Sequence, residues 1–452
     1  AVWVVAADDS GALPLDRRVS GSAAWLVLAA VGTYLVGYRF YSRFLATRVL
    51  GIDPTRATPA ERLSNGRDFV PTTRGVLFGH HFAAIAGAGP LVGPVLAAQF
   101  GYLPGMLWIV FGVVLGGAVQ DFVILFASMR RDGKSLGQMA KEEVGPVTGL
   151  AAMIAILAIM IILLAVLALV VVNALRDSPW GMFTIACTVP IALLMGFWMK
   201  VWRPGRTMEA TAVGIVLLMA SLVGGRFVAE HATLGPTFTM GGTTIAWLII
   251  AYGFVASVLP VWMLLCPRDY LSTFMKVGTI VLLAVGILAV LPPIKLPALT
   301  QFIDGTGPVF AGKLFPFAFI TIACGAISGF HALVASGTTP KMLRREGDAP
   351  LIGYGGMLTE SFVAVMALCA AAVLDPGVYF AINAPLATLG GSLDAAAETI
   401  RGWGFAVTPA QMEALAASVG ESTLLARTGG APSLAVGMAQ IFAGAFGAHL
   451  TA

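Results

Sequence analysis

Charged residues are scarce in this sequence. Only 11% of its 452 residues are Asp, Glu, Lys or Arg, whereas 58% are hydrophobic. Soluble domains carry about 25% charged residues. A soluble enzyme of this size would lack the polar surface that keeps it in solution, and a disordered chain would need the opposite balance. The composition therefore predicts a multi-pass membrane protein.

Cysteine is also rare, and the usual cofactor motifs are missing. The four cysteines, Cys187, Cys266, Cys324 and Cys369, form no Cys-x-x-Cys pair and have no histidine at ligand spacing. We expect them to be buried as small apolar residues, with no disulfide and no metal site. Gly133-Lys134-Ser135 resembles the end of a phosphate-binding loop, but Ser128 stands where that loop needs glycine. No cofactor, metal, nucleotide-driven pump or nucleic-acid partner is predicted.

Long apolar runs cover most of the chain. A helix needs about 20 apolar residues to cross the core of a bilayer. The sequence therefore predicts an all-α membrane protein with about 11 transmembrane helices. Their expected ranges are 22–44, 75–100, 104–128, 148–174, 180–201, 208–228, 243–265, 271–292, 313–337, 352–374 and a weaker 429–449.

Basic residues alternate between the loops that join these spans. Cytoplasmic loops carry an excess of Lys and Arg, so the richly basic loops are predicted to be cytoplasmic. The loops that hold only Arg176, Arg226 or Lys295 are predicted to be external. The basic set comprises Arg48, Arg56, Arg62, Arg67, Arg74, Arg130, Arg131, Lys134, Lys141, Lys200, Arg203, Arg206, Arg268, Lys341, Arg344 and Arg345.

Four regions lie outside the ten core helices. We expect residues 1–21 to form an external segment left from a missing helix, 22–46 a peripheral transmembrane helix, and 47–74 a basic cytoplasmic loop. Residues 384–425 are less apolar and are predicted to form short helices on the external face. Within them, Thr408-Pro409-Ala410-Gln411 has the pattern of a helix start, and Gly420 follows the expected helix end.

Three predicted spans contain helix-breaking residues. Proline removes a backbone donor and clashes with a preceding carbonyl, so the helix must kink or unwind. Inside a membrane the freed carbonyls are tolerated only against protein or a watery cavity. Single glycines can instead serve close helix packing. The residues concerned are Gly87, Gly89, Pro90, Gly93 and Pro94 in the second span, Gly253 and Pro260 in the seventh, and Gly325, Gly329 and Gly337 in the ninth.

Paired broken helices are typical of secondary transporters. With 75–100 as the first core helix, 243–265 becomes the sixth and enters the membrane from the opposite side. Residues 75–228 and 243–449 would then form two inverted repeats of five helices, which resembles the LeuT-type (APC-like) arrangement. In that resemblance, carbonyls near residues 86–89 can hold a cation together with Ser336, Thr338 or Thr339. The alternative is that these hydroxyls cap helix ends locally.

We single out five ionisable residues within the predicted spans: His80, His81, Asp121, His331 and Glu360. A charge at the centre of a transmembrane helix costs about 2.5–3.5 kcal/mol, so such residues are candidates for function. Histidine titrates near neutral pH, and a carboxylate within reach can accept a proton. We expect these residues to couple protons or to form a gate. The alternative is a set of static pairs.

Several long motifs resemble the carbon starvation protein family, also called the peptide transporter carbon starvation family. They are FGHHFAAIAGAGPLVGPVLAAQ (78–99), AVQDF (118–122), SPWG (178–181), LPVWMLLCPRDYLSTFMK (259–276), FIDGTGPVF (302–310), ITIACGAISGFHALVASGTTPKM (320–342) and RTGGAPSLAVGMA (427–439). The resemblance implies a bacterial inner-membrane uptake system for pyruvate or peptides, coupled to protons and used during carbon starvation. Family members carry a further N-terminal span and several spans beyond the last motif.

Together these features predict a secondary transporter and not an enzyme. Its substrate, pyruvate or a short peptide, would bind at the unwound helices through the main chain of Gly87, Gly89 and Gly93, because amides at a helix N-terminus suit a carboxylate. Tyr252 and Ser257 would add hydrogen bonds. The coupling ion is expected to be a proton, with sodium as the alternative. A membrane sensor or channel with an indirect role in starvation is the competing interpretation.

Overall fold

The fold is built from helices. A computed structural model describes residues 21–260, 262–418, 423–428 and 430–446, and no β-strand occurs among them. The prediction of an all-α fold is confirmed for these residues. The segment 1–20 and Gly420 lie outside the described residues.

Among the described residues, six helices are long and apolar enough to cross a membrane, and a bent pair makes a seventh. They coincide with seven of the predicted spans. The six are α6–α7 (Tyr102–Met129), α9 (Pro146–Leu175), α10 with its π-helical end (Pro179–Trp202), α11 (Thr207–Glu230), α14 (Leu265–Val290) and the segment ending in α18 (Glu346–Ala372). The bent pair is α4 (Arg74–Ile85) and α5 (Gly89–Ala97), which continues to Phe100.

The other predicted spans are helical but shorter or interrupted. They are α2 (Ala24–Val36), which continues as π-helical turns to Val49, α13 (Gly242–Val258), the group α15 (Leu314–Thr321), α16 (Ala323–Ala326) and α17 (Gly329–Gly337), and α23 (Ala431–Phe446). Three short helices, α3 (Pro59–Arg62), α8 (Leu136–Glu143) and α12 (Leu234–Phe238), lie in the connections.

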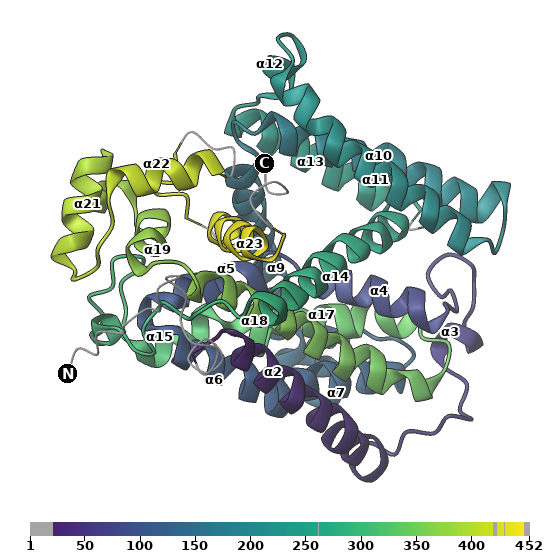
Figure 1. The fold of residues 1–452 in the computed structure, drawn as a ribbon. Helices are drawn as coiled ribbons and strands as arrows, with labels where there is room; N and C mark the ends of the chain where they lie inside the picture. Colours follow the sequence, from purple (N-terminus) through teal and green to yellow (C-terminus); the bar gives the residue numbers. More distant parts are fainter. Residues whose placement is uncertain (1–20, 261, 419–422, 429, 447–452) are drawn as a thin grey trace.

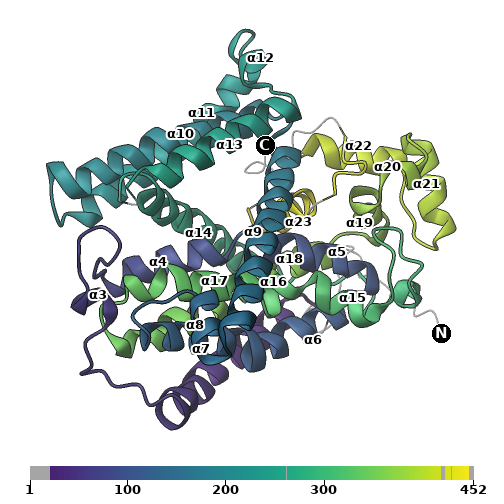
Figure 2. The ribbon, with the colours of Figure 1, turned by 180° about the vertical axis from the view of Figure 1, so that it is seen from behind.

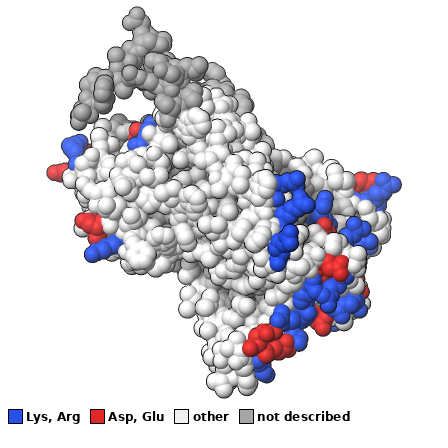
Figure 3. All heavy atoms as spheres, turned by 90° about the horizontal axis from the view of Figure 1, so that it is seen from below, with Lys and Arg blue, Asp and Glu red and all other residues white. Residues whose placement is uncertain are grey.

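Helix α9 has the surface of a lipid-facing helix. Of its 30 residues only Gly149, Val172 and Leu175 are buried, whereas Leu157 and Leu164 are 61% and 64% exposed. An apolar surface of this extent does not stay in water. Figure 3 shows most of the charged side chains at one end of the molecule, a few at the opposite end, and a broad uncharged surface between them. Both observations fit a protein embedded in a bilayer.

Helix α18 (Gly356–Ala372) forms the centre of the molecule (Figure 1). Nearly all of its side chains are buried, and it packs against α2, α4, α5, α6, α16 and α23. Its Ala and Ser residues let neighbouring backbones approach closely. At Gly325 of α16, an added Cβ would lie 2.5 Å from the Cβ of Ala364. The breaks in α4–α5 and α15–α17 therefore lie against one rigid, buried helix.

The first predicted break is confirmed, and it is shorter than the stretch from Gly87 to Pro94 that holds the predicted helix-breaking residues. The bend between α4 and α5 is 46°, and only residues 86–88 are non-helical. Pro90 lies in the first turn of α5, where a backbone donor is not needed. Pro94 lies inside α5. Helix α5 is therefore a half-helix, the second half of the broken span, and its N-terminus lies at the break.

The ninth span is broken as predicted, whereas the seventh is not broken in its middle. Residues 322 and 327–328 interrupt α15–α17. Gly253 lies inside the regular helix α13, which ends before Pro260. Proline disfavours helical backbone at the residue before it, so it ends this helix without unwinding its centre. Helix α14 then begins at Leu265, six residues before the predicted 271.

Helices α10, α11 and α13 lie side by side in an arm apart from α5 and α18 (Figures 1 and 2). The main packing partner of α13 is α9. On the opposite side lie α19 (Pro376–Asn383), α20 (Leu386–Leu389), α21 (Leu393–Gly402) and α22 (Pro409–Ser418). The predicted helix start is confirmed, because the Gln411 amide donates to Thr408 Oγ1 at 3.2 Å.

Candidate functional site

Three of the five predicted ionisable residues form one buried cluster. Asp121 of α7, His331 of α17 and Glu360 of α18 are each 0% exposed. His331 Nδ1 lies 3.0 Å from Asp121 Oδ2, and His331 Nε2 lies 3.9 Å from Glu360 Oε1. The imidazole therefore stands between two carboxylates that come from different helices.

Close contacts at small residues and one side-chain amide hydrogen bond fix the relative positions of the helices that carry the cluster. Gln120 Nε2 donates to the carbonyl of Ser328 at 2.6 Å, where α17 begins. A Cβ at Gly117 would overlap the carbonyl oxygen of Ala326, and one at Gly353 would lie 2.8 Å from Phe122 Cα. Helices α7, α16 and the start of the α18 segment therefore meet backbone to backbone around the cluster.

The cluster is suited to binding and passing a proton. Two carboxylates without water are costly unless they are paired or neutral. A protonated His331 compensates one carboxylate, and its two ring nitrogens face different partners. The cluster therefore places one titratable ring between Asp121 and Glu360.

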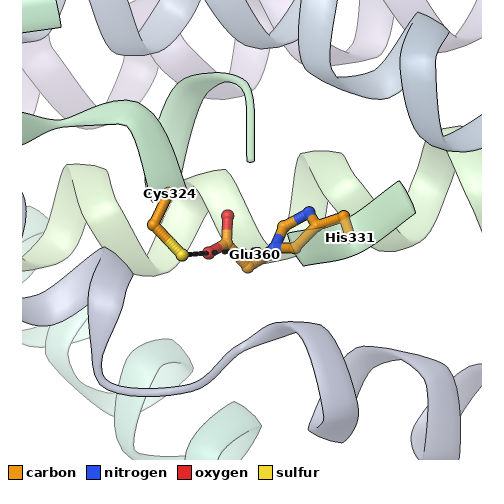
Figure 4. Close-up of side chains that lie close together, drawn as sticks. All are labelled: Cys324, His331 and Glu360. Carbon is orange, nitrogen blue, oxygen red and sulfur yellow. Dashed lines mark hydrogen bonds and ion pairs between the residues drawn. The ribbon is translucent and has the colours of Figure 1, made fainter. Parts of the chain in front are cut away.

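Cys324 joins this cluster, which the spacing of the residues did not indicate. Its Sγ lies 3.7 Å from Glu360 Oε1 (Figure 4). A side chain at Gly89 would overlap Cys324 Sγ, so the thiol lies directly against the break between α4 and α5. Cys187 and Cys266 are also half-buried, and only Cys369 is fully buried as expected.

Lys276 of α14 is a second residue that the sequence interpretation missed. Its Nζ donates to the carbonyls of Ala83 and Ala86 at 3.1 and 2.7 Å. Thr273, one turn earlier, donates to the carbonyl of Gly79 at 2.8 Å. The signal was present, because Lys276 lies inside the predicted span 271–292 and ionisable residues there are candidates for function. An ammonium group therefore satisfies the carbonyls at the end of α4.

The two adjacent histidines point to different partners. His81 Nδ1 lies 2.8 Å from Thr339 Oγ1, and His80 Nδ1 lies 3.4 Å from Asp269 Oδ2. Successive helical residues point about 100° apart, so this divergence was expected. His81 also lies against Gly356, one turn before Glu360. The His81–Thr339 pair is therefore next to the cluster, whereas His80 faces α14.

The candidate cation ligands are occupied elsewhere. Ser336 Oγ donates to Ala332 O at 2.7 Å and accepts from the Leu136 amide at 3.1 Å. Thr339 contacts His81, and Thr338 is exposed. The Ala86 carbonyl is bonded by Lys276. The bond from Ser336 to the Ala332 carbonyl is local, as in the alternative, whereas Thr339 and the Ala86 carbonyl bond residues of other helices.

The predicted substrate residues fall into two places. Gly87 is exposed beside open space, Gly89 lies against Cys324, and Gly93 packs on α15. On α13, Tyr252 stacks under the guanidinium of Arg268 at 4.7 Å, and Ser257 donates to the Phe254 carbonyl at 2.7 Å. The structure therefore brings the three glycines together with the cluster and leaves Tyr252 and Ser257 in the α10–α13 arm.

Alanine substitutions are expected to separate the roles of Gly93 and Gly87. A Cβ at Gly93 would overlap the backbone oxygen of Thr321, so Gly93→Ala is expected to lower the unfolding free energy by about 1–3 kcal/mol. No atom lies within 4 Å of a Cβ at Gly87, so Gly87→Ala should leave stability within about 0.5 kcal/mol. Thermal unfolding in detergent measures both. Equal melting temperatures for the two variants would contradict the packing role of Gly93.

A cavity of about 750 Å³ lies between the end of α9 and the start of α23. Leu96 of α5 reaches it, as do Asn173, Arg176 and Arg427. Gly430 packs against the main chain of Leu91, in the first turns of α5. The cavity is therefore adjacent to the half-helix that starts at the break.

The chain is similar to a protein family and to known proteins over most of its length. Residues 22–452 match the family model described as carbon starvation protein CstA. The chain is 58% identical to the peptide transporter CstA of Escherichia coli strain K12 over 99% of its length, and 57% identical to the pyruvate/proton symporter BtsT of the same organism over 95%. It is 48% identical to the peptide transporter CstA of Bacillus subtilis strain 168 over 95%.

The chain is shorter than these relatives. It covers 65% of the Escherichia coli CstA sequence, 63% of BtsT and 69% of the Bacillus subtilis protein. No solved structure matches it.

Proposed function

Because the chain belongs to the carbon starvation protein CstA family, we propose that it is a secondary transporter that imports pyruvate or short peptides together with protons. It would act in the bacterial inner membrane when carbon is short. The observation that carries this proposal is the buried Asp121–His331–Glu360 cluster beside a helix break. The names of its relatives, a peptide transporter and a pyruvate/proton symporter, support both substrate classes.

The substrate carboxylate is proposed to bind at the break between α4 and α5. Gly87, Leu91 and Val92 donate their amides to the carbonyls of Ile85 and Ala88, and Pro90 has no N–H. The amides of Ala88 and Gly89 and the positive end of the α5 dipole are therefore proposed to bind the carboxylate. Gly87 adjoins open space, and the ammonium of Lys276 lies on the preceding carbonyls. The cavity lined by Arg176, its ion-pair partner Asp177 and Arg427 is proposed as the approach, because Leu96 of α5 also lines it.

The LeuT-type inverted repeat, with about 11 spans, remains our proposal for the architecture. The broken helices α4–α5 and α15–α17 support it, since both lie against α18 at the proposed site. Helix α13, which this arrangement pairs with α4–α5, packs mainly on α9. We propose that the α10–α13 arm closes on the break during transport and that Tyr252 and Ser257 then reach the substrate.

Uptake into proteoliposomes tests the proposed function. The protein should accumulate labelled pyruvate or a labelled dipeptide under an inward proton gradient. A gradient of about one pH unit stores about 1.4 kcal/mol per proton, enough for about tenfold accumulation with one coupled proton. Saturable uphill uptake supports a transporter. Uptake that only equilibrates indicates a channel, and no uptake of either substrate by the full-length protein would overturn the proposal.

A further inference from the structure

The cluster beside the break has the arrangement of a metal site. Cys324 of α16, His331 of α17 and Glu360 of α18 each offer one ligand atom, and these atoms lie within 4.8 Å of one another (Figure 4). Glu360 Oε1 is 3.7 Å from Cys324 Sγ and 3.9 Å from His331 Nε2. Ligands on a tetrahedral zinc ion lie roughly 3.3–3.8 Å apart. Side-chain shifts of up to about 1 Å would bring all three ligand atoms into this range.

Two of the ligand groups present polar atoms without a partner. Among the described residues, His331 Nε2 and Glu360 Oε2 are buried and make no hydrogen bond. Both side chains are 0% exposed. A buried polar atom without a partner is costly and rare. A cation at this position would satisfy both atoms at once.

The far side of the imidazole is already organised for a metal. Asp121 Oδ2 lies 3.0 Å from His331 Nδ1, which directs Nε2 toward Glu360 and Cys324. Metal-binding histidines are commonly held by a carboxylate in this way, which fixes the tautomer and orients the ring. Asp121 therefore has the place of a supporting residue behind the ligand.

The donor set selects the class of ion. A thiolate, an imidazole and a carboxylate suit Zn²⁺ and related ions, whereas Na⁺, Mg²⁺ and Ca²⁺ prefer oxygen ligands alone. Three protein ligands leave a fourth position for water or another small ligand.

We infer that Cys324, His331 and Glu360 form a binding site for a thiophilic divalent cation of the Zn²⁺ class, with Asp121 as the supporting residue. Metal ligands must be deprotonated, so metal and protons compete for this site. If the proposed transport function is correct, on which this last step rests, bound Zn²⁺ inhibits proton-coupled uptake.

Cobalt binding tests the site without relying on transport. Purified protein, first stripped with a chelator, is titrated with Co²⁺, and the thiolate-to-cobalt charge-transfer band is recorded. We expect one ion per chain, displacement of the band by Zn²⁺, and loss of the band in Cys324→Ser. Cys369→Ala, in the adjacent α18, removes a buried cysteine outside the site and should keep the band. Asp121→Asn is expected to weaken binding by about 10–100-fold.

Several results would decide against the inference. Absence of a stoichiometric band in the unmodified protein would overturn it, as would a band that survives Cys324→Ser and disappears in Cys369→Ala. In case Cys324→Ser fails to fold, a second measurement uses the unmodified protein: Zn²⁺ should slow alkylation of Cys324 at least tenfold, and an unchanged rate would refute the site. A normal band with no inhibition of uptake by Zn²⁺ would refute the competition with protons alone. A normal band with no uptake at all would count against the proposed function and leave the site standing.

Discussion

Glu360→Gln is expected to abolish uphill accumulation of substrate while the protein stays folded. Glutamine has almost the shape of glutamate but cannot bind and release a proton. Glu360 is completely buried beside His331 and Cys324. Under an inward gradient of about one pH unit, accumulation should fall from about tenfold to about onefold.

The comparison with Glu360→Ala separates coupling from packing. Alanine also removes the titratable group, but it leaves a cavity in the most buried helix of the molecule, which is expected to lower stability by roughly 2–5 kcal/mol. Both variants should lose accumulation, and only Glu360→Ala should unfold at a markedly lower temperature.

Glu398→Gln on α21 is the matched control, because Glu398 is exposed and α21 packs on α19, α20 and α22. Its uptake should equal that of the unmodified protein. Accumulation by Glu360→Gln at the unmodified level would show that Glu360 does not carry the coupled proton.

Features that depend on local sequence were predicted well. The break at residues 86–88 follows from closely spaced glycine and proline, and apolar composition alone located the seven predicted spans that coincide with helices long and apolar enough to cross a membrane. The choice of Asp121, His331 and Glu360, which lie buried in one cluster, followed from the cost of burying a charge. Each of these inferences needs only neighbours along the chain and the properties of the bilayer.

Features that depend on tertiary contacts were not predicted. Cys324 and Glu360 are 36 residues apart on different helices, so no ligand spacing could reveal their contact. Tyr252 was assigned to the substrate on the assumption that α13 lies beside the first break, whereas α13 packs on α9. Lys276 was visible as a buried charge, but only its contacts show that it serves the carbonyls of α4.

Lys276→Met is expected to eliminate uptake and to destabilise the break. The substitution keeps a long apolar stem and removes the ammonium that bonds Ala83 O and Ala86 O. Hydrogen bonds to charged groups contribute about 1.5–3 kcal/mol each. A buried carbonyl that loses its donor also stays desolvated with no hydrogen bond to compensate. With partial relaxation and water near the exposed Gly87, we expect stability to fall by about 2–4 kcal/mol. Uptake at equal amounts of inserted protein should fall at least about tenfold, because the half-helix loses its fixed geometry.

The role of Lys276 as an internal cation gives this prediction a second readout. Because the ammonium already bonds the carbonyls that a coupling cation would need, uptake by the unmodified protein should not change when choline replaces Na⁺. Lys276→Arg keeps the charge and should retain part of the uptake, whereas Lys276→Met should retain none. Lys295→Met removes only an exposed pair with Asp375, worth at most about 1 kcal/mol, and should transport normally. If Lys276→Met transports like the unmodified protein, or if uptake by the unmodified protein requires Na⁺, then Lys276 does not replace a metal cation at the break, and the hydroxyls of Ser336, Thr338 and Thr339 become the better candidates for a sodium site.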